Sequence, residues 1–186
     1  MSRLHLNPWL LVVFAGGAAY PLLVYSGMTV LPPIALVLLG LALIGMRLLG
    51  MRKNTDVKIW EIAFLIASFG LAGMLFLNAE AAVQAYPVVV SLSAASVFGL
   101  SLWHPPTMAE RIACLTETYL PPGGVIYSRR VTVVWVAFLL VNALISTELS
   151  IWGTLAQWAL WNGLVSYLLI GALFIGEMVV RRMVCR

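Results

Sequence analysis

The sequence predicts an all-α membrane protein, a polytopic bundle of about six transmembrane helices forming a single integral membrane domain over residues 1–186. The composition is 62% hydrophobic and 10% charged, and the mean hydropathy is +1.01. A soluble domain carries roughly 25% charged residues, so this chain cannot maintain a water-soluble surface. The spacing of its apolar runs and the placement of its basic residues support the same class.

Six apolar runs approach or exceed the roughly 20 residues that a membrane-crossing helix needs. They cover residues 8–27, 30–49, 57–77, 85–103, 131–146 and 155–180. The first run is too long for a signal peptide, and no clear cleavage site ends it. Pro21 predicts a kink near residue 17, because proline has no amide hydrogen to donate.

The basic residues indicate how the chain is threaded. All eleven lie at the termini, in the second loop or in the fourth loop, at positions 3, 47, 52, 53, 58, 111, 129, 130, 181, 182 and 186. By the positive-inside rule, both termini are predicted to be cytoplasmic. The isoelectric point near 9.4 therefore reflects topology, and we expect no nucleic-acid partner.

Residues 104–130 form the long polar interruption, a predicted cytoplasmic loop. Thr107 and Glu110 have the spacing of a capping box. They predict a short amphipathic helix over about residues 108–116, lying at the membrane interface. The Pro-Pro-Gly-Gly segment within 120–124 is expected to end this helix and turn the chain back. Arg129 and Arg130 would then lie at the membrane surface, before the fifth helix.

Three interpretations of this loop remain open. It is a topological linker, a docking or lipid-headgroup site, or a catalytic site. In the second case Arg111, Arg129 and Arg130 face anionic phosphate. In the third, His104 and Glu110 act together. All five residues are candidate contacts for a partner or a headgroup.

Polar residues inside apolar runs are costly and therefore informative. The candidates for an intramembrane polar site are Glu61, Asn142, Asn162 and Glu177. The two glutamates either form interfacial ion pairs, Glu177 with Arg181 four residues later, or line a polar pocket open to the cytoplasm. The asparagines lie equally far from a turn centred near residue 152, which predicts equal depth. Each bonds either the other asparagine or a backbone carbonyl.

Neither a metal nor another cofactor is expected. Cys114 and Cys185 fall on the predicted cytoplasmic side, where thiols stay reduced. No Cys-x-x-Cys pair occurs, and His5 and His104 are far apart in sequence. The chain also has no nucleophile elbow or phosphate-binding loop, so no catalytic residue is assigned and the enzyme question stays open.

A recognisable pattern runs into the fifth helix: Arg130, then Trp135 and Phe138 spaced as W-x-x-F, then Asn142. With Pro106, Arg111, Leu120, Pro121 and Arg129, over about residues 45–182, it resembles the bacterial intracellular septation protein A family of small inner-membrane proteins. The phrase SLWHPPTMAERIA…LPPGGVIYSRRVT is more similar to uncharacterised membrane proteins encoded beside fatty-acid-synthase-like and aryl-polyene genes. The double proline and double glycine depart from the septation protein A pattern.

The resemblance implies a multi-pass protein of the bacterial inner membrane with a role in envelope biogenesis. We expect first a non-enzymatic accessory or scaffold protein in cell-envelope or acyl-lipid biogenesis, recruiting partners through residues 104–130. Its expected partners are membrane lipids and envelope-biogenesis or acyl-chain synthesis proteins. One alternative is a small lipid-binding or lipid-translocating protein. The other is an integral membrane enzyme, which requires several polar side chains converging at one depth.

Overall fold

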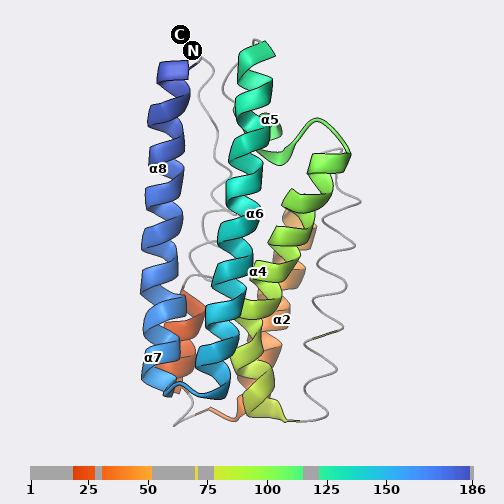
Figure 1. Ribbon diagram of the computed structural model, residues 1–186. Helices are drawn as coiled ribbons and strands as arrows, with labels where there is room; N and C mark the ends of the chain where they lie inside the picture. The colour runs from red at the N-terminus through yellow and green to blue at the C-terminus, as the bar shows by residue number, and fades with distance from the viewer. Residues whose placement is uncertain (1–18, 28–30, 52–69, 71–77, 115–121, 185–186) are drawn as a thin grey trace.

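The computed structural model describes residues 19–27, 31–51, 70, 78–114 and 122–184. The elongated helices lie side by side (Figure 1), and no strand occurs in the described parts of the chain. The labelled elements are α2 (Pro33–Met51), α4 (Ala79–Trp103), α5 (Met108–Ala113), α6 (Pro122–Ile151), α7 (Leu155–Leu160), η1 (Trp161–Val165) and α8 (Ser166–Val184). A further helical segment covers 19–27. The predicted all-α class is confirmed.

Among the described residues, three helices are long and apolar enough to cross a membrane: Ala79–Trp103, Gly123–Ile151 and Leu155–Arg181. They correspond to the fourth, fifth and sixth apolar runs. The 30 residues of α6 extend about 45 Å, more than the hydrocarbon thickness of about 30 Å. Most of the first and third runs, including the expected kink near residue 17, lies outside the described residues.

The helix α4 begins earlier than expected. Asn78 caps it, because its Oδ1 accepts from the Glu80 amide at 2.9 Å. Glu80 and Gln84 therefore lie in the helix, ahead of the apolar run that was expected to begin at residue 85. Near Pro87, which has no amide hydrogen, the Gln84 carbonyl accepts from the α7 side chain Trp158 at 3.2 Å. Neighbouring helices commonly satisfy carbonyls near a proline in this way.

The start of α6 also differs from the prediction. The helix begins at Pro122, so residues 122–124 of the expected turn are helical instead. Proline suits the first position of a helix, because the amide it lacks would have no partner there. Arg129 and Arg130 consequently lie about two turns inside α6. The preceding α5 ends at Ala113, and residues 115–121 lie outside the described part.

The short helix α5 docks on α6 near the end of α4. The Glu110 carboxylate accepts from the Thr107 amide at 3.2 Å, as the predicted capping box requires. The Ala109 amide donates to Thr132 Oγ1 of α6 at 3.2 Å. Thr132 is fully buried and in turn donates to the Ser128 carbonyl at 2.9 Å. These bonds attach α5 to the start of α6.

The apolar core lies toward the opposite end of the molecule. It joins the segment 19–27 to α2, α4 and α7 through Tyr20, Val24, Leu36, Val37, Ala82, Val83, Tyr86 and Trp158, among others. Gly40 permits the close approach of α2, because a Cβ there would meet the Tyr86 ring at 3.0 Å. In Figure 1, α2 and α4 run in the same direction, as expected for the second and fourth helices of a six-helix threading.

Candidate functional site

A buried polar network joins α4, α6, η1 and α8. At its centre is Asn142, whose exposed fraction is 6%. Its Nδ2 donates to Ser91 Oγ at 3.0 Å. Its Oδ1 accepts from Trp161 Nε1 at 3.1 Å and from Ser166 Oγ at 2.7 Å. One amide therefore ties together three other parts of the bundle.

The second asparagine makes separate contacts. Asn162 Oδ1 accepts from Ser146 Oγ at 2.6 Å, and its Nδ2 donates to the Trp158 carbonyl at 2.9 Å. The described structure contains no direct bond between Asn142 and Asn162, so the predicted pair is wrong. The alternative, a bond to a carbonyl of its own helical segment, is found at Asn162.

The cause of this difference is the turn. Thr154 begins α7, with its hydroxyl accepting from the Gln157 amide at 3.2 Å. The bonded residues 142 and 166, and likewise 146 and 162, lie equally far from Thr154 along the chain. The register of α6 against the helical segment that follows is therefore centred on Thr154 instead of residue 152. Each asparagine then lies opposite a serine: Asn142 faces Ser166, and Asn162 faces Ser146.

The π-helical turn η1 shapes this network. Trp161 and Ser166, five residues apart, both donate to Asn142 Oδ1. In a regular α-helix, residues five apart point about 140° away from each other, at 100° per residue. A π-helix bonds residues five apart, and the Ser166 amide indeed donates to the Trp161 carbonyl. This wider turn brings both side chains to one face.

Several polar side chains converge in this network, as the alternative of an integral membrane enzyme would require. Its described members are amides, hydroxyls and an indole, from Ser91, Asn142, Ser146, Trp161, Asn162 and Ser166. None of these side chains is an acid or base near neutral pH. We therefore interpret the network as a device that fixes helix register. The hydroxyl partners were missed from the sequence, although an asparagine precedes a serine by four residues in both helices.

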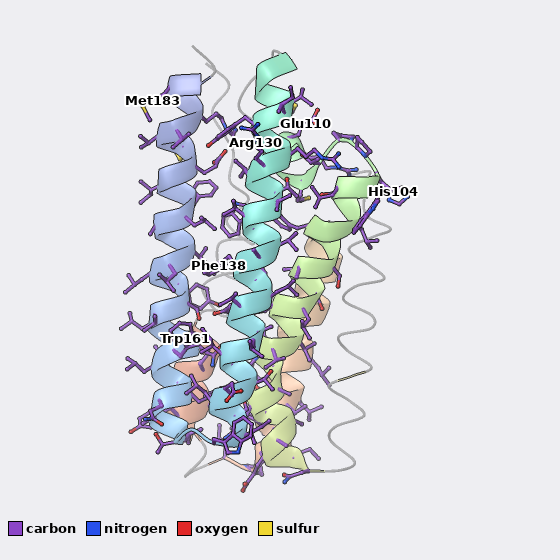
Figure 2. The ribbon with its side chains drawn as sticks, viewed as in Figure 1. His104, Glu110, Arg130, Phe138, Trp161 and Met183 are labelled. Carbon is purple, nitrogen blue, oxygen red and sulfur yellow. The ribbon has the colours of Figure 1, made fainter. Side chains whose placement is uncertain are left out.

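A groove of about 500 Å³ separates α6 from α8 nearer the α5 end. It is lined by Tyr127, Arg130, Val131, Val134 and Trp135 of α6, and by Ala172, Leu173, Gly176, Glu177 and Val180 of α8. The Trp135 ring lies 5.9 Å from the Phe98 ring and meets Phe138 edge-on at 6.1 Å. Figure 2 shows Arg130 near the upper ends of both helices, and Phe138 and Trp161 further down.

A smaller cavity of about 130 Å³ lies on the inner side of the groove, under α5. Val131, Trp135 and Glu177 line both spaces, so the two are adjacent. Ala109, Ile112, Phe98 and Phe174 supply apolar walls, and Arg181 completes the lining. Glu177 and Arg181 form an ion pair, as their spacing predicted.

The remaining candidates lie at helix ends or on the surface. Arg111 Nε donates to the Pro106 carbonyl at 2.9 Å, and His104 Nδ1 lies 3.2 Å from the Leu100 carbonyl. Figure 2 shows His104 at the outer edge, away from Glu110, and no hydrogen bond or ion pair within the described structure joins them. Arg129 is exposed, as is Arg130 in the groove.

Glu61 lies outside the described residues, so the polar pocket expected to be lined by Glu61 and Glu177 stays a prediction. Within the described part, no group of three or more His, Cys, Asp or Glu residues could hold a metal ion. Cys114 is exposed with a free thiol.

Comparison of the chain with family models, curated proteins and solved structures finds no match. The resemblance to the septation protein A family therefore rests on the residues quoted from the sequence. Three of those residues lie along α6 beside the groove and the network: Trp135 in the groove wall, Phe138 against it, and Asn142 at the network centre.

Proposed function

We propose that this protein is a non-enzymatic membrane accessory protein that binds one acyl chain of a membrane amphiphile between α6 and α8. The observation that carries the proposal is the groove of about 500 Å³. Its volume falls within the range of roughly 300–1,000 Å³ typical of small-molecule sites. The groove walls are mostly aliphatic and aromatic, with polar groups at one end, which matches an amphiphile.

The length of the groove fits one leaflet. From Tyr127 to Trp135 the α6 wall rises about 12 Å, at 1.5 Å per residue. Half of a hydrocarbon core of about 30 Å is about 15 Å. A chain lying along the groove therefore crosses most of a leaflet, with its polar end near Tyr127 and Arg130. The other end of the groove closes toward Leu173 and Trp135, above the network.

The surface of α8 suits a lipid environment. In its most apolar stretch, the span Leu155–Arg181 has only 6% of its residues buried. Exposed apolar side chains such as Leu168 and Ile175 lie along it. A chain can therefore enter the groove sideways from the bilayer without crossing a polar barrier.

We assign the groove to the cytoplasmic leaflet of a bacterial inner membrane in a six-span topology. The assignment is supported by the basic residues and by the resemblance to inner-membrane proteins. Reporter fusions at residue 118 should report the cytoplasm, and fusions at residue 152 the periplasm. A cytoplasmic signal at residue 152 would contradict the topology.

The groove is tested by filling it. A Cβ added at Gly176 meets nothing within 4 Å, so Gly176→Leu can place its side chain in the groove without a backbone clash. Gly171 of the same helix is equally open but does not line the groove, so Gly171→Leu is the matched control.

The probe is a neutral sixteen-carbon alcohol, with binding measured in detergent and lipid nanodiscs by native mass spectrometry. Gly176→Leu should weaken binding by about tenfold or more, equivalent to at least about 1.4 kcal/mol. Gly171→Leu should bind like the wild type. Equal binding by all three proteins, or equal losses in both variants, would refute the groove as the site.

A further inference from the structure

The deep end of the groove is closed by an aromatic side chain that its neighbours hold in place. Trp135 is the last α6 residue of the groove wall, counted along the chain from Tyr127. Its ring lies 5.9 Å from the ring of Phe98 in α4 and meets the ring of Phe138 edge-on at 6.1 Å. Ring pairs at such separations are favourable. The two contacts orient the indole, so this end of the groove has a firm wall.

The opposite wall, on α8, ends at the same depth. Its lining residues nearest to the turn at Thr154 are Ala172 and Leu173. Because the bonded residues of the network centre the register on Thr154, Leu173 and Trp135 lie equally far from the turn. A chain that lies along the groove therefore reaches the end of both walls at one level.

A second apolar space lies behind this end wall. Trp135 and Val131 line both the groove and the cavity of about 130 Å³ under α5, so they stand between the two spaces. Apart from the ion pair of Glu177 with Arg181, the cavity walls are apolar. Apolar cavities suit hydrocarbon better than water. Trp135 therefore keeps a chain in the groove out of a space that could hold more of it.

These walls define a length. An extended saturated chain advances about 1.25 Å per carbon, the projection of a bond of about 1.52 Å at a near-tetrahedral angle. The α6 wall from Tyr127 to Trp135 rises about 12 Å, which corresponds to about ten carbons. Only carbons that lie against the walls gain packing contacts with the protein. Further carbons return to the bilayer along the exposed face of α8.

We infer that Trp135 is the residue that determines chain length, and that the groove holds about ten carbons of its ligand. This inference rests on the proposed function and adds to it the class of chain that is bound. Chains shorter than this length leave part of the walls uncovered and bind more weakly. Longer chains bind no more tightly, because Trp135 excludes their additional carbons from the protein.

The test measures the binding of neutral alcohols with six, ten and sixteen carbons by native mass spectrometry, at equal mole fraction in nanodisc lipid. The wild type should bind the ten-carbon alcohol about threefold or more tightly than the six-carbon alcohol, and within about twofold of the sixteen-carbon alcohol. Trp135→Val joins the groove to the inner cavity, so the sixteen-carbon alcohol should gain about threefold or more over the ten-carbon alcohol.

Trp152→Val is the matched control, because Trp152 is 74% exposed and lies outside the groove. It should keep the wild-type length preference. Ala172→Leu provides an independent variant if Trp135→Val does not fold. Ala172 is exposed and lines the deep end, so a larger side chain there shortens the groove. The advantage of the ten-carbon over the six-carbon alcohol should then fall below about twofold, with six-carbon binding unchanged.

The outcomes separate the chain length from the groove. If wild-type affinity does not differ between six and ten carbons, or rises further from ten to sixteen, the length limit fails and the groove stands. If the wild type binds none of the three alcohols, the groove itself fails. An unchanged length preference in folded Trp135→Val would exclude Trp135 as the determinant. An unchanged preference in Ala172→Leu would place the end of the chain elsewhere and overturn the inference.

Discussion

The two ends of the α6–α8 pair are held together in opposite ways. Toward the Thr154 turn, side-chain hydrogen bonds join α6 to the start of α8 and to the η1 turn before it: Asn142 bonds Ser166 of α8, and Ser146 bonds Asn162 of η1. Toward the α5 end, the groove separates them, and the bond from Tyr127 Oη to the Glu177 carbonyl is a longer 3.3 Å. The same two helices thus form both a closed and an open contact.

The difference follows from depth. A polar group deep in hydrocarbon has no water to bond, so it must be satisfied within the protein. Near the membrane surface, water and headgroups can complete the bonding of groups such as Arg130. The closed end can therefore set the register of the pair, while the open end leaves the groove between the two helices. Three predictions test this division.

The largest expected effect is at the centre of the closed end. Asn142→Leu removes the partner of Ser91, Trp161 and Ser166 at once. We expect the free energy of unfolding to fall by about 2–3 kcal/mol, the cost of buried groups left unsatisfied. The measurement is denaturant unfolding in mixed micelles.

The matched control is Val141→Leu, a neighbouring position that is 55% exposed. It should change the free energy by no more than about 0.5 kcal/mol. If both variants lose the same stability, the closed end is not held by its polar bonds.

A smaller effect is expected at the open end, where α5 docks. Thr132→Val keeps the side-chain shape but leaves the buried Ala109 amide without its acceptor. We expect a loss of about 1–2 kcal/mol, concentrated in the seating of α5. Faster protease cleavage between α5 and α6 would report it.

Thr147→Val is the control, because within the described part of the chain the Thr147 hydroxyl bonds only the Ala143 carbonyl of its own helix, at 2.8 Å. Its cleavage should match the wild type. Unchanged cleavage in Thr132→Val would show that apolar contacts alone seat α5.

The smallest effect concerns the register. A double-mutant cycle of Asn162→Leu with Ser146→Ala should give a coupling energy near 0.6 kcal/mol, the average for such contacts in a membrane protein. The cycle of Asn142→Leu with Asn162→Leu should give a smaller value, because these residues share no bond. A larger coupling between the two asparagines would restore the register centred on residue 152.

Hydropathy predicted the three membrane-length helices of the described residues, because each apolar run carries its own signal. The sixth run was expected over residues 155–180, and the helical stretch from α7 to α8 covers 155–184. The ion pair of Glu177 with Arg181 was also predictable, since residues four apart share a helix face. Such local rules failed at Pro122, because a proline can begin a helix as well as end one.

The site itself depends on tertiary geometry. The partners of Asn142 follow from a turn centred on Thr154, and a shift of two residues was enough to replace an asparagine by a serine. The groove depends on how far α6 and α8 diverge, which no single helix encodes. The sequence alone therefore could not show that Arg130 lines the groove and that its neighbour Arg129 does not.

The π-helical turn also determines which face of α8 points toward α6. Restoring a regular α-helix over the same five residues of η1 would rotate everything beyond it by about 100° relative to α7. Gly176 and Glu177 would then turn away from α6, and a different stripe of α8 would face it. The wide turn at the closed end thus determines, about two to three turns later, which side chains of α8 line the groove.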